Sequence, residues 1–188
     1  MDNPIADLSR RLGVGVCRGS ESDVLARYAG AARVSKADLV IRVTADCPLI
    51  APSLIDEMLG AVEKTGPWDH YSNVVERTYP RGLDVEIVSA RALVRAEREA
   101  KSAPEREHVT PYLYRHPELF RVGHHKGERD LSAHRWTVDT EEDFRFMETL
   151  FAELSDPAAA SWKDALAVLE RLPELSAINA QVQQKPVS

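Results

Sequence analysis

The chain has 188 residues, 44% of them hydrophobic and 29% charged, which is an ordinary composition for one domain with a sizeable core. Its net charge of -6 argues against a protein that mainly grips nucleic acid, although an acidic protein can still carry a locally positive site for an anionic substrate. The two cysteines lack metal-binding spacing, and no signal peptide or membrane-spanning stretch is visible, so we expect a cytoplasmic protein that binds neither nucleic acid nor membrane.

Helices and strands alternate over the first third of the chain. The spacing of apolar residues and the positions of glycine, proline and capping residues define five elements. They are a helix at 3–13, a strand at 14–18, a helix capped by Ser20, a strand at 39–43 and a helix from Pro52 to residue 62. The run at 39–43 is of the kind that is buried on both faces of a parallel sheet. This alternation predicts an α/β fold.

The rhythm changes after residue 65, where shorter strands and helices are expected. The expected strands are 70–75, 85–88, 120–124 and 135–138, and the expected helices are one capped by Ser89 that runs to 100, one from Pro104, one from Thr140, and two at 162–172 and 173–183. Pro111 is expected to kink the helix that Pro104 opens. The chain shows no repeat and no long linker, which favours a single domain.

The segment Val43-Thr44-Ala45-Asp46-Cys47-Pro48 places Asp46 just beyond a buried strand. In open α/β sheets, ligands bind at the carboxyl ends of strands. A carboxylate at that edge can hold a divalent cation that neutralises phosphate oxygens. Position alone favours equally the alternative that Asp46 only caps the turn before Pro48.

The segment Arg135-Trp136-Thr137-Val138-Asp139-Thr140 also ends a strand with a carboxylate. The simple interpretation is a helix N-cap, with the acids at 141–143 favoured by the positive helix terminus. If the two strands are neighbours, however, Asp46 and Asp139 can share one Mg²⁺, which takes one or two carboxylates plus substrate phosphates.

Two further segments carry polar groups suited to a substrate. His108 and Tyr112 are four residues apart, so a helix would place them on one face, where they can orient a hydroxylated or anionic ligand; the alternative is a surface histidine over a packed tyrosine. In Tyr79-Pro80-Arg81-Gly82, the arginine can clamp a carboxylate or phosphate, unless this is a polar hairpin loop with solvated charges. The run 124–130 is expected to be a solvated loop without a metal site.

In this order, the stretches VTADCPLI, YPRGLDVEI, EREHVTPYLYRHPELF and RWTVDTEEDF resemble a known enzyme family. They are similar to the cytidylyltransferases related to spore-coat polysaccharide biosynthesis protein F and to the CMP-sugar synthetases for 3-deoxy-manno-octulosonate and for sialic and pseudaminic acids. The likeness covers about residues 3–155. It implies a Rossmann-like nucleotide-diphospho-sugar transferase fold, with a mixed sheet and helices on both faces.

The resemblance also implies an activity: transfer of CMP from CTP to an acidic or phosphorylated sugar, with release of pyrophosphate, for surface polysaccharide biosynthesis. It assigns Asp46 and Asp139 as catalytic, metal-binding aspartates that hold Mg²⁺. By the same likeness, the substrate-binding residues are Arg81, Asp84, His108, Tyr112 and Arg135. A homodimer is implied as well.

The family pattern opens with a strand and a glycine- and arginine-containing loop that holds the triphosphate, then a helix and a second strand. No stretch of this chain matches that opening, so we expect an N-terminally truncated domain that lacks the first two strands, roughly 50 residues. Within a single incomplete domain at 1–188, residues 66–90 and 104–130 are expected to form the sugar pocket and dimer contact. Residues 156–188 are expected to form C-terminal helices.

Two other functions compete with this prediction. A non-catalytic sugar-binding or assembly module derived from the same family would keep the pocket and the dimer surface without the chemistry. A glycosyltransferase that uses an already activated sugar would carry a strand-end DxD motif, and Asp46 is instead followed by Cys47 and Pro48.

Overall fold

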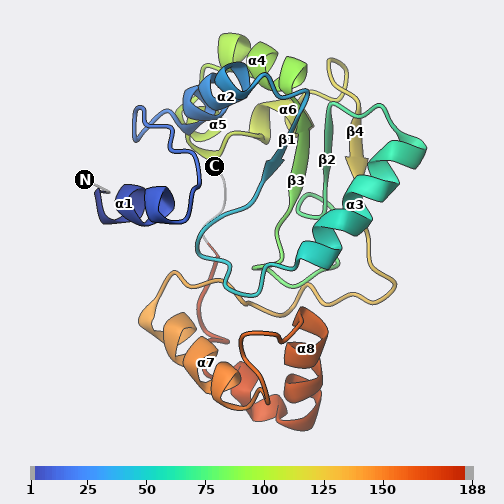
Figure 1. Cartoon of the computed structure of the whole chain (residues 1–188). Coiled ribbons are helices and arrows are strands. Elements are labelled where there is room, and N and C mark those ends of the chain that lie inside the picture. The colour runs from blue at the N-terminus through green and yellow to red at the C-terminus, as the bar shows by residue number, and fades with distance from the viewer. Residues whose placement is uncertain (1–2, 185–188) are drawn as a thin grey trace.

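The computed structural model describes residues 3–184, which fold around a mixed four-stranded sheet (Figure 1). Its strands are β1 Leu39–Arg42, β2 His70–Ser72, β3 Glu86–Ser89 and β4 Val122–His124, in the order β1-β3-β2-β4. The strand β3 pairs antiparallel with β1 and β2, whereas β2 and β4 are parallel. The carboxyl ends of β1, β2 and β4 therefore meet at one edge of the sheet.

Helices cover both faces of this sheet, as the sequence predicts. Successive side chains of β3 point to opposite faces and so contact different helices. Ile87 packs with α3, whereas Val88 packs with α2 and α4. The helices are α1 Asn3–Arg11, α2 Val24–Ser35, α3 Pro52–Thr65, α4 Ala90–Glu99, α5 Ala103–His108, α6 Pro111–Arg115, α7 Glu141–Ala152 and α8 Trp162–Arg171. Between residues 3 and 184, no helix has both the length and the apolar character that a membrane crossing requires.

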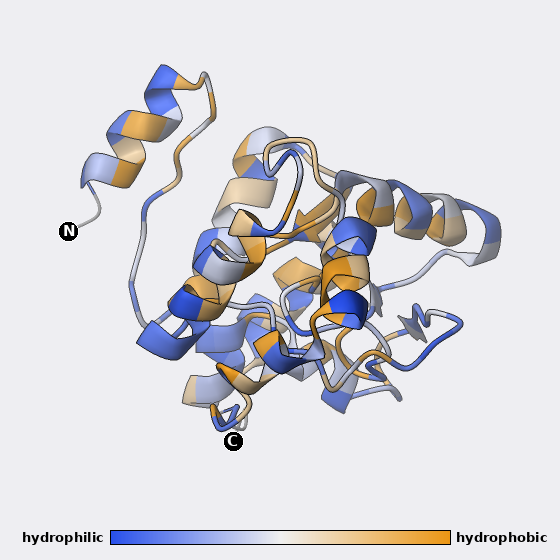
Figure 2. Ribbon diagram, turned by 90° about the horizontal axis from the view of Figure 1, so that it is seen from below, coloured by the Kyte–Doolittle hydropathy of each residue, from blue (hydrophilic) through white to orange (hydrophobic). Residues whose placement is uncertain are grey.

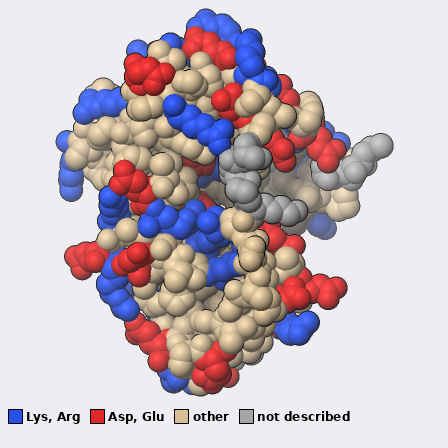
Figure 3. Space-filling view, turned by 180° about the vertical axis from the view of Figure 1, so that it is seen from behind, with Lys and Arg blue, Asp and Glu red and all other residues tan. Residues whose placement is uncertain are grey.

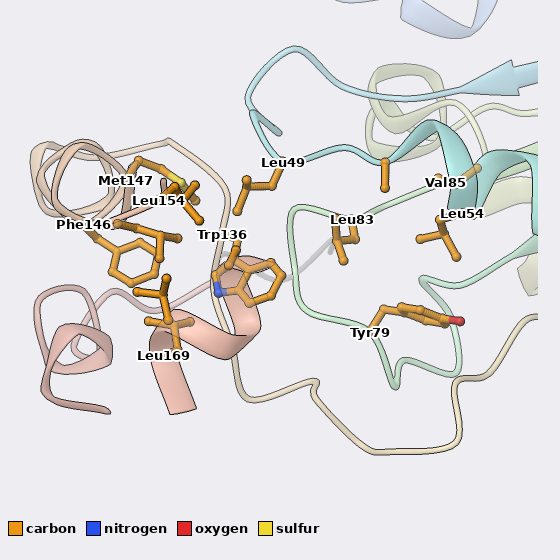
Figure 4. Close-up of a cluster of buried hydrophobic side chains, with 14 of the residues drawn as sticks. Leu49, Leu54, Tyr79, Leu83, Val85, Trp136, Phe146, Met147, Leu154 and Leu169 are labelled. Carbon is orange, nitrogen blue, oxygen red and sulfur yellow. The ribbon is translucent and has the colours of Figure 1, made fainter. Parts of the chain in front are cut away.

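The hydrophobic cluster that contains Ile87 and α3 extends to α7 and α8, which lie beyond the carboxyl ends of β1, β2 and β4 (Figure 1). Trp136 is fully buried at its centre, between Leu83 on the sheet side and Phe146 on α7 (Figure 4). The segment that carries Trp136 is thus fixed against both parts of the fold. Its neighbours in sequence line the candidate site described below.

The N-terminal region differs from the sequence prediction. Residues 14–18 form no strand; Val14 and Val16 are exposed, because no strand among the described residues pairs with them. The N-cap of α2 is Asp23 rather than Ser20, and its carboxylate accepts a hydrogen bond from the Ala26 amide. Figure 2 shows α1 apart from the other helices, joined to them by an extended connection.

Strand β1 was expected to be buried on both faces of a parallel sheet, and that prediction is wrong. Its pairing with β3 is antiparallel, and among the described residues it forms one edge of the sheet. Leu39 and Ile41 are each more than a third exposed. A β-branched run therefore marked the strand correctly but not its place in the sheet.

Three segments near the site also differ from expectation. The helix from Pro104 does not kink at Pro111 but breaks before it, since Val109 takes a φ of 76° and Pro111 begins a separate helix, α6. Residues 135–138 are extended, yet they form only one isolated bridge, between Arg81 and Arg135. The last expected helix is a short 3₁₀ turn, Pro173–Ala177.

The segment at 124–130 is not a simple solvated loop. His125 is buried; its ring stacks on Tyr79 and hydrogen-bonds to the Tyr71 hydroxyl and the Glu57 carboxylate. His124 turns instead toward Glu76. Alternation along β4 explains the difference, because it sends successive side chains to opposite faces.

Candidate functional site

A cavity of about 940 Å³ opens at the edge of the sheet where β1 and β2 end. It lies between the sheet and the N-terminus of α7, and Figure 3 shows the hollow with basic side chains gathered along it. Six of the seven predicted site residues line it. They are Asp46, Arg81, Asp84, His108, Arg135 and Asp139.

Asp46 lies in the turn after β1 and faces this cavity. Its backbone carbonyl accepts a hydrogen bond of 2.9 Å from the Val138 amide, and its Oδ2 accepts one of 2.9 Å from the Thr137 hydroxyl. Burial raises the pKa of this carboxyl, but hydrogen bonds from Thr44, Thr137 and Cys47 outweigh it, so the pKa lies below its usual value. Asp46 is therefore an ionised carboxylate at neutral pH.

Asp139 reaches the same wall of the cavity, because residues 137–138 are hydrogen-bonded to Asp46. Its side chain is 48% exposed, and its Oδ2 accepts a hydrogen bond of 2.7 Å from Arg135. The described residues contain no group of three or more acidic, histidine or cysteine side chains that could hold a metal ion. Two carboxylates nevertheless fit Mg²⁺, which completes its coordination with water and substrate phosphates.

Asp143 anchors this part of the site and was not singled out from the sequence. It is fully buried at the third position of α7, where it forms a capping box with Thr140. Arg135 donates to both of its oxygens at 2.8 Å, and the Asn179 amide donates to Oδ1 at 2.9 Å. From the sequence, Asp143 is only one of three acids favoured by the positive N-terminus of a helix. No pattern in the neighbouring sequence indicates that Arg135 and Asn179 converge on it.

The ionisation of Asp143 makes the stability of the fold depend on pH. Burial would raise the pKa of its carboxyl, but hydrogen bonds from Arg135, Asn179 and the Asp139 amide lower it from 3.8 to about 2. Because the pKa of Asp143 is lower in the folded chain than in the unfolded chain, its ionised carboxylate stabilises the fold at pH values above the unfolded pKa. This contribution of about 2 kcal/mol is lost as pH falls from about 4 to 2. The free-energy difference between the wild type and Asp143→Asn in urea unfolding is therefore expected to shrink over that range. A constant difference would contradict this.

Arg81 lies in a loop that packs tightly against the segment containing Trp136. Gly82 has a φ of 104°, and a Cβ there would lie 2.4 Å from the Trp136 carbonyl oxygen, so this position requires glycine. Arg77 pairs with Asp84 at 2.6 and 2.8 Å, but the Arg81 guanidinium has no hydrogen-bond acceptor between residues 3 and 184. Burial and the nearby Arg77 lower the pKa of Arg81. The loop thus presents to the cavity a guanidinium that has no hydrogen-bond partner among the described residues.

The opposite end of the cavity is built around a buried carboxylate, Glu86. Arg42 donates to its Oε1 at 2.5 Å, and the His70 ring is 2.9 Å from its Oε2. Burial raises the pKa of Glu86, but His70, Arg42 and Thr110 lower it more, so the carboxylate stays ionised. Sequence reasoning missed this group, because Glu86 and Arg42 look like ordinary strand residues until the register sets them side by side.

His108 and Tyr112 do not share a helix face, so that prediction is wrong. The break at Val109 separates them: His108 lines the cavity, whereas the Tyr112 hydroxyl donates to Glu99 outside it. Tyr114 takes the inward position instead. Within the described part of the chain, neither the His108 ring nor the Tyr114 hydroxyl has a hydrogen-bond partner.

Comparisons with known proteins point to one family. A family model described as cytidylyltransferase matches residues 2–184. An uncharacterised protein of Methanocaldococcus jannaschii is 35% identical over 189 residues, which are 98% of this chain and 74% of that protein. The spore coat polysaccharide biosynthesis protein SpsF of Bacillus subtilis is 31% identical over 169 residues, or 86% of this chain and 67% of that one.

A solved structure is also similar. The structure of a cytidylyltransferase from Leptospira borgpetersenii matches with a TM-score of 0.88 at 30% identity, over 98% of this chain and 76% of that chain. The likeness therefore extends over nearly all of this chain. The chain is a member of the cytidylyltransferase family.

Proposed function

We propose that this protein transfers CMP from CTP to a sugar and releases pyrophosphate, in the cytoplasm and as a homodimer, for surface polysaccharide biosynthesis. Its family supports a nucleotidyltransferase. The name of its Bacillus subtilis relative supports the polysaccharide context for the product. The observation that carries the proposal is the cavity, where three side chains that can donate have no hydrogen-bond partner among the described residues.

Four of the acids that line the cavity already have partners within the chain. Asp46 is bonded by Thr137, Asp84 by Arg77, Glu86 by Arg42 and His70, and Asp139 by Arg135. Among the described residues, three side chains that can donate have no hydrogen-bond partner: Arg81, His108 and Tyr114. A cavity with free donors favours a ligand rich in acceptors, such as a sugar with an anionic group and a nucleotide phosphate.

The reaction itself needs positioning more than covalent help from the protein. An oxygen of the sugar forms a bond to the α-phosphorus of CTP while the bond from that phosphorus to the bridging oxygen of pyrophosphate breaks, and the sugar hydroxyl loses its proton to solvent. Asp46 and Asp139 would hold Mg²⁺, which supplies neutralisation of phosphate charge when bound. Arg81 would bind an anionic group, and His108 and Tyr114 would donate to sugar hydroxyls.

The test is pyrophosphate release by the whole chain. The protein is incubated with Mg²⁺, each of the four nucleoside triphosphates and a panel of neutral, phosphorylated and carboxylated sugars. We expect release only with CTP and only with an acidic or phosphorylated sugar. Equal pyrophosphate release with all four nucleotides, or release without a sugar, would contradict the proposal. Sugar binding without any release, unchanged in Asp46→Asn and Asp139→Asn, would identify a non-catalytic sugar-binding module instead.

A further inference from the structure

The arginine at position 135 links two carboxylates of unequal exposure. Its Nη2 donates to Asp139 at 2.7 Å and to Asp143 at 2.8 Å, and its Nε donates to Asp143 at 2.8 Å. The Asp143 side chain is fully buried, whereas that of Asp139 is 48% exposed. Arg135 is therefore held mainly by Asp143, with two bonds to its carboxylate and one to that of Asp139.

Asp143 also sets the backbone that carries Asp139. Its Oδ2 accepts hydrogen bonds from the backbone amides of Asp139 at 3.1 Å and Thr140 at 3.2 Å. The Asn179 amide, which donates to Oδ1 at 2.9 Å, fixes the orientation of the carboxylate from the C-terminal segment. Asp143 thus fixes the position of the Arg135 guanidinium and that of the backbone at Asp139 and Thr140.

We propose that Asp143 is a positioning residue that keeps Asp139 free to bind a divalent cation. A cation at Asp139 would compete with the positive charge of Arg135, which donates a single hydrogen bond to this carboxylate. While Asp143 balances its charge, Arg135 can release Asp139 and remain in place. Without that buried charge, the nearest counter-ion of Arg135 would be Asp139 itself, and the guanidinium would compete directly with the metal. This inference rests on the proposed function, because it takes Asp139 as a metal ligand.

The test measures Mn²⁺ binding by electron paramagnetic resonance, with no turnover required. Asp143→Asn is expected to weaken binding roughly 10- to 100-fold, as loss of an outer-shell partner does in metal sites. Asp164→Asn is the matched control, since Asp164 is also the third-position acid of a capping box, at α8, but is exposed and, within the described range, hydrogen-bonds only to Ser161. It is expected to bind Mn²⁺ as the wild type does.

A double variant separates positioning from a purely structural role. If Asp143 acts by holding Arg135 away from Asp139, then Arg135→Gln in the Asp143→Asn background restores Mn²⁺ affinity to within about threefold of the wild type. If the loss came from damage to the α7 cap, the double variant would stay weak and the inference would be overturned.

Two further variants keep the outcome decisive. Should Asp143→Asn not fold, as judged by thermal unfolding, Arg135→Lys replaces it: a lysine keeps a charge beside Asp143 but lacks the fork that reaches both acids, so Mn²⁺ affinity should not fall. A tenfold fall would overturn the inference. Asp139→Asn tests whether Asp139 is a metal ligand. If this variant still binds Mn²⁺, the proposed metal site itself is refuted. If Asp139→Asn loses Mn²⁺ binding while Asp143→Asn binds normally, only the positioning role of Asp143 is refuted.

Discussion

Replacing either Asp46 or Asp139 with asparagine is expected to lower the rate of CMP transfer roughly 10³-fold, the size of effect seen when a charge-stabilising group is removed from phosphoryl transfer. Asparagine keeps the volume and the hydrogen-bond acceptor but removes the negative charge that a divalent cation needs. The measurement is the initial rate of pyrophosphate release at saturating CTP and sugar.

The control for this prediction is Asp7→Asn on α1. Asp7 is exposed, and within residues 3–184 its side chain pairs only with Arg10 on the same helix, so the rate should not change. Thermal unfolding of the variants separates lost chemistry from lost structure. A fall of less than tenfold in either Asp46→Asn or Asp139→Asn, with the fold intact, would show that the missing charge does not serve the reaction.

Trp136→Ala is expected to lower the free energy of unfolding by about 3–5 kcal/mol, as for other large-to-alanine core substitutions. Trp136 is fully buried between the sheet and α7, and its indole N–H has no hydrogen-bond partner within residues 3–184. The loss therefore comes from packing and from the cavity left behind. Urea unfolding with a linear extrapolation measures it.

Trp162 provides the comparison, since it belongs to the same cluster but is only partly buried. Because less of its surface leaves water on folding, Trp162→Ala should cost less than half as much. Equal losses in the two variants would contradict the central place of Trp136 in the packing between sheet and helices.

The sequence was informative where a local pattern fixes a local structure. The apolar run at 39–43 identified β1, and the order of Asp46 and Asp139 at the ends of extended segments anticipated that both reach one cavity. Capping residues placed α4 and α7 within one residue of their observed starts, because Ser89 and Thr140 satisfy the first amides of those helices.

Sequence-based prediction failed where contacts between distant segments of the chain determine the structure. Glu86 and Arg42 meet only through the antiparallel register of β1 and β3, and no spacing along the chain reveals it. Asp143 gains its role from Asn179, which is 36 residues away. Val109, which has a positive φ, breaks the helix between His108 and Tyr112. Because β-branched residues rarely adopt a positive φ, the sequence does not predict this break.

The proposed function requires that Asp46 and Asp139 share a single divalent cation beside the nucleotide. Equilibrium binding of Mn²⁺ in the presence of CTP, counted by electron paramagnetic resonance, tests it most directly. One ion per chain is predicted for the wild type, and Asp46→Asn and Asp139→Asn should each weaken its binding strongly, because the proposed site draws a carboxylate from each of the two residues. Tight binding of one ion that survives in either variant would contradict the claim.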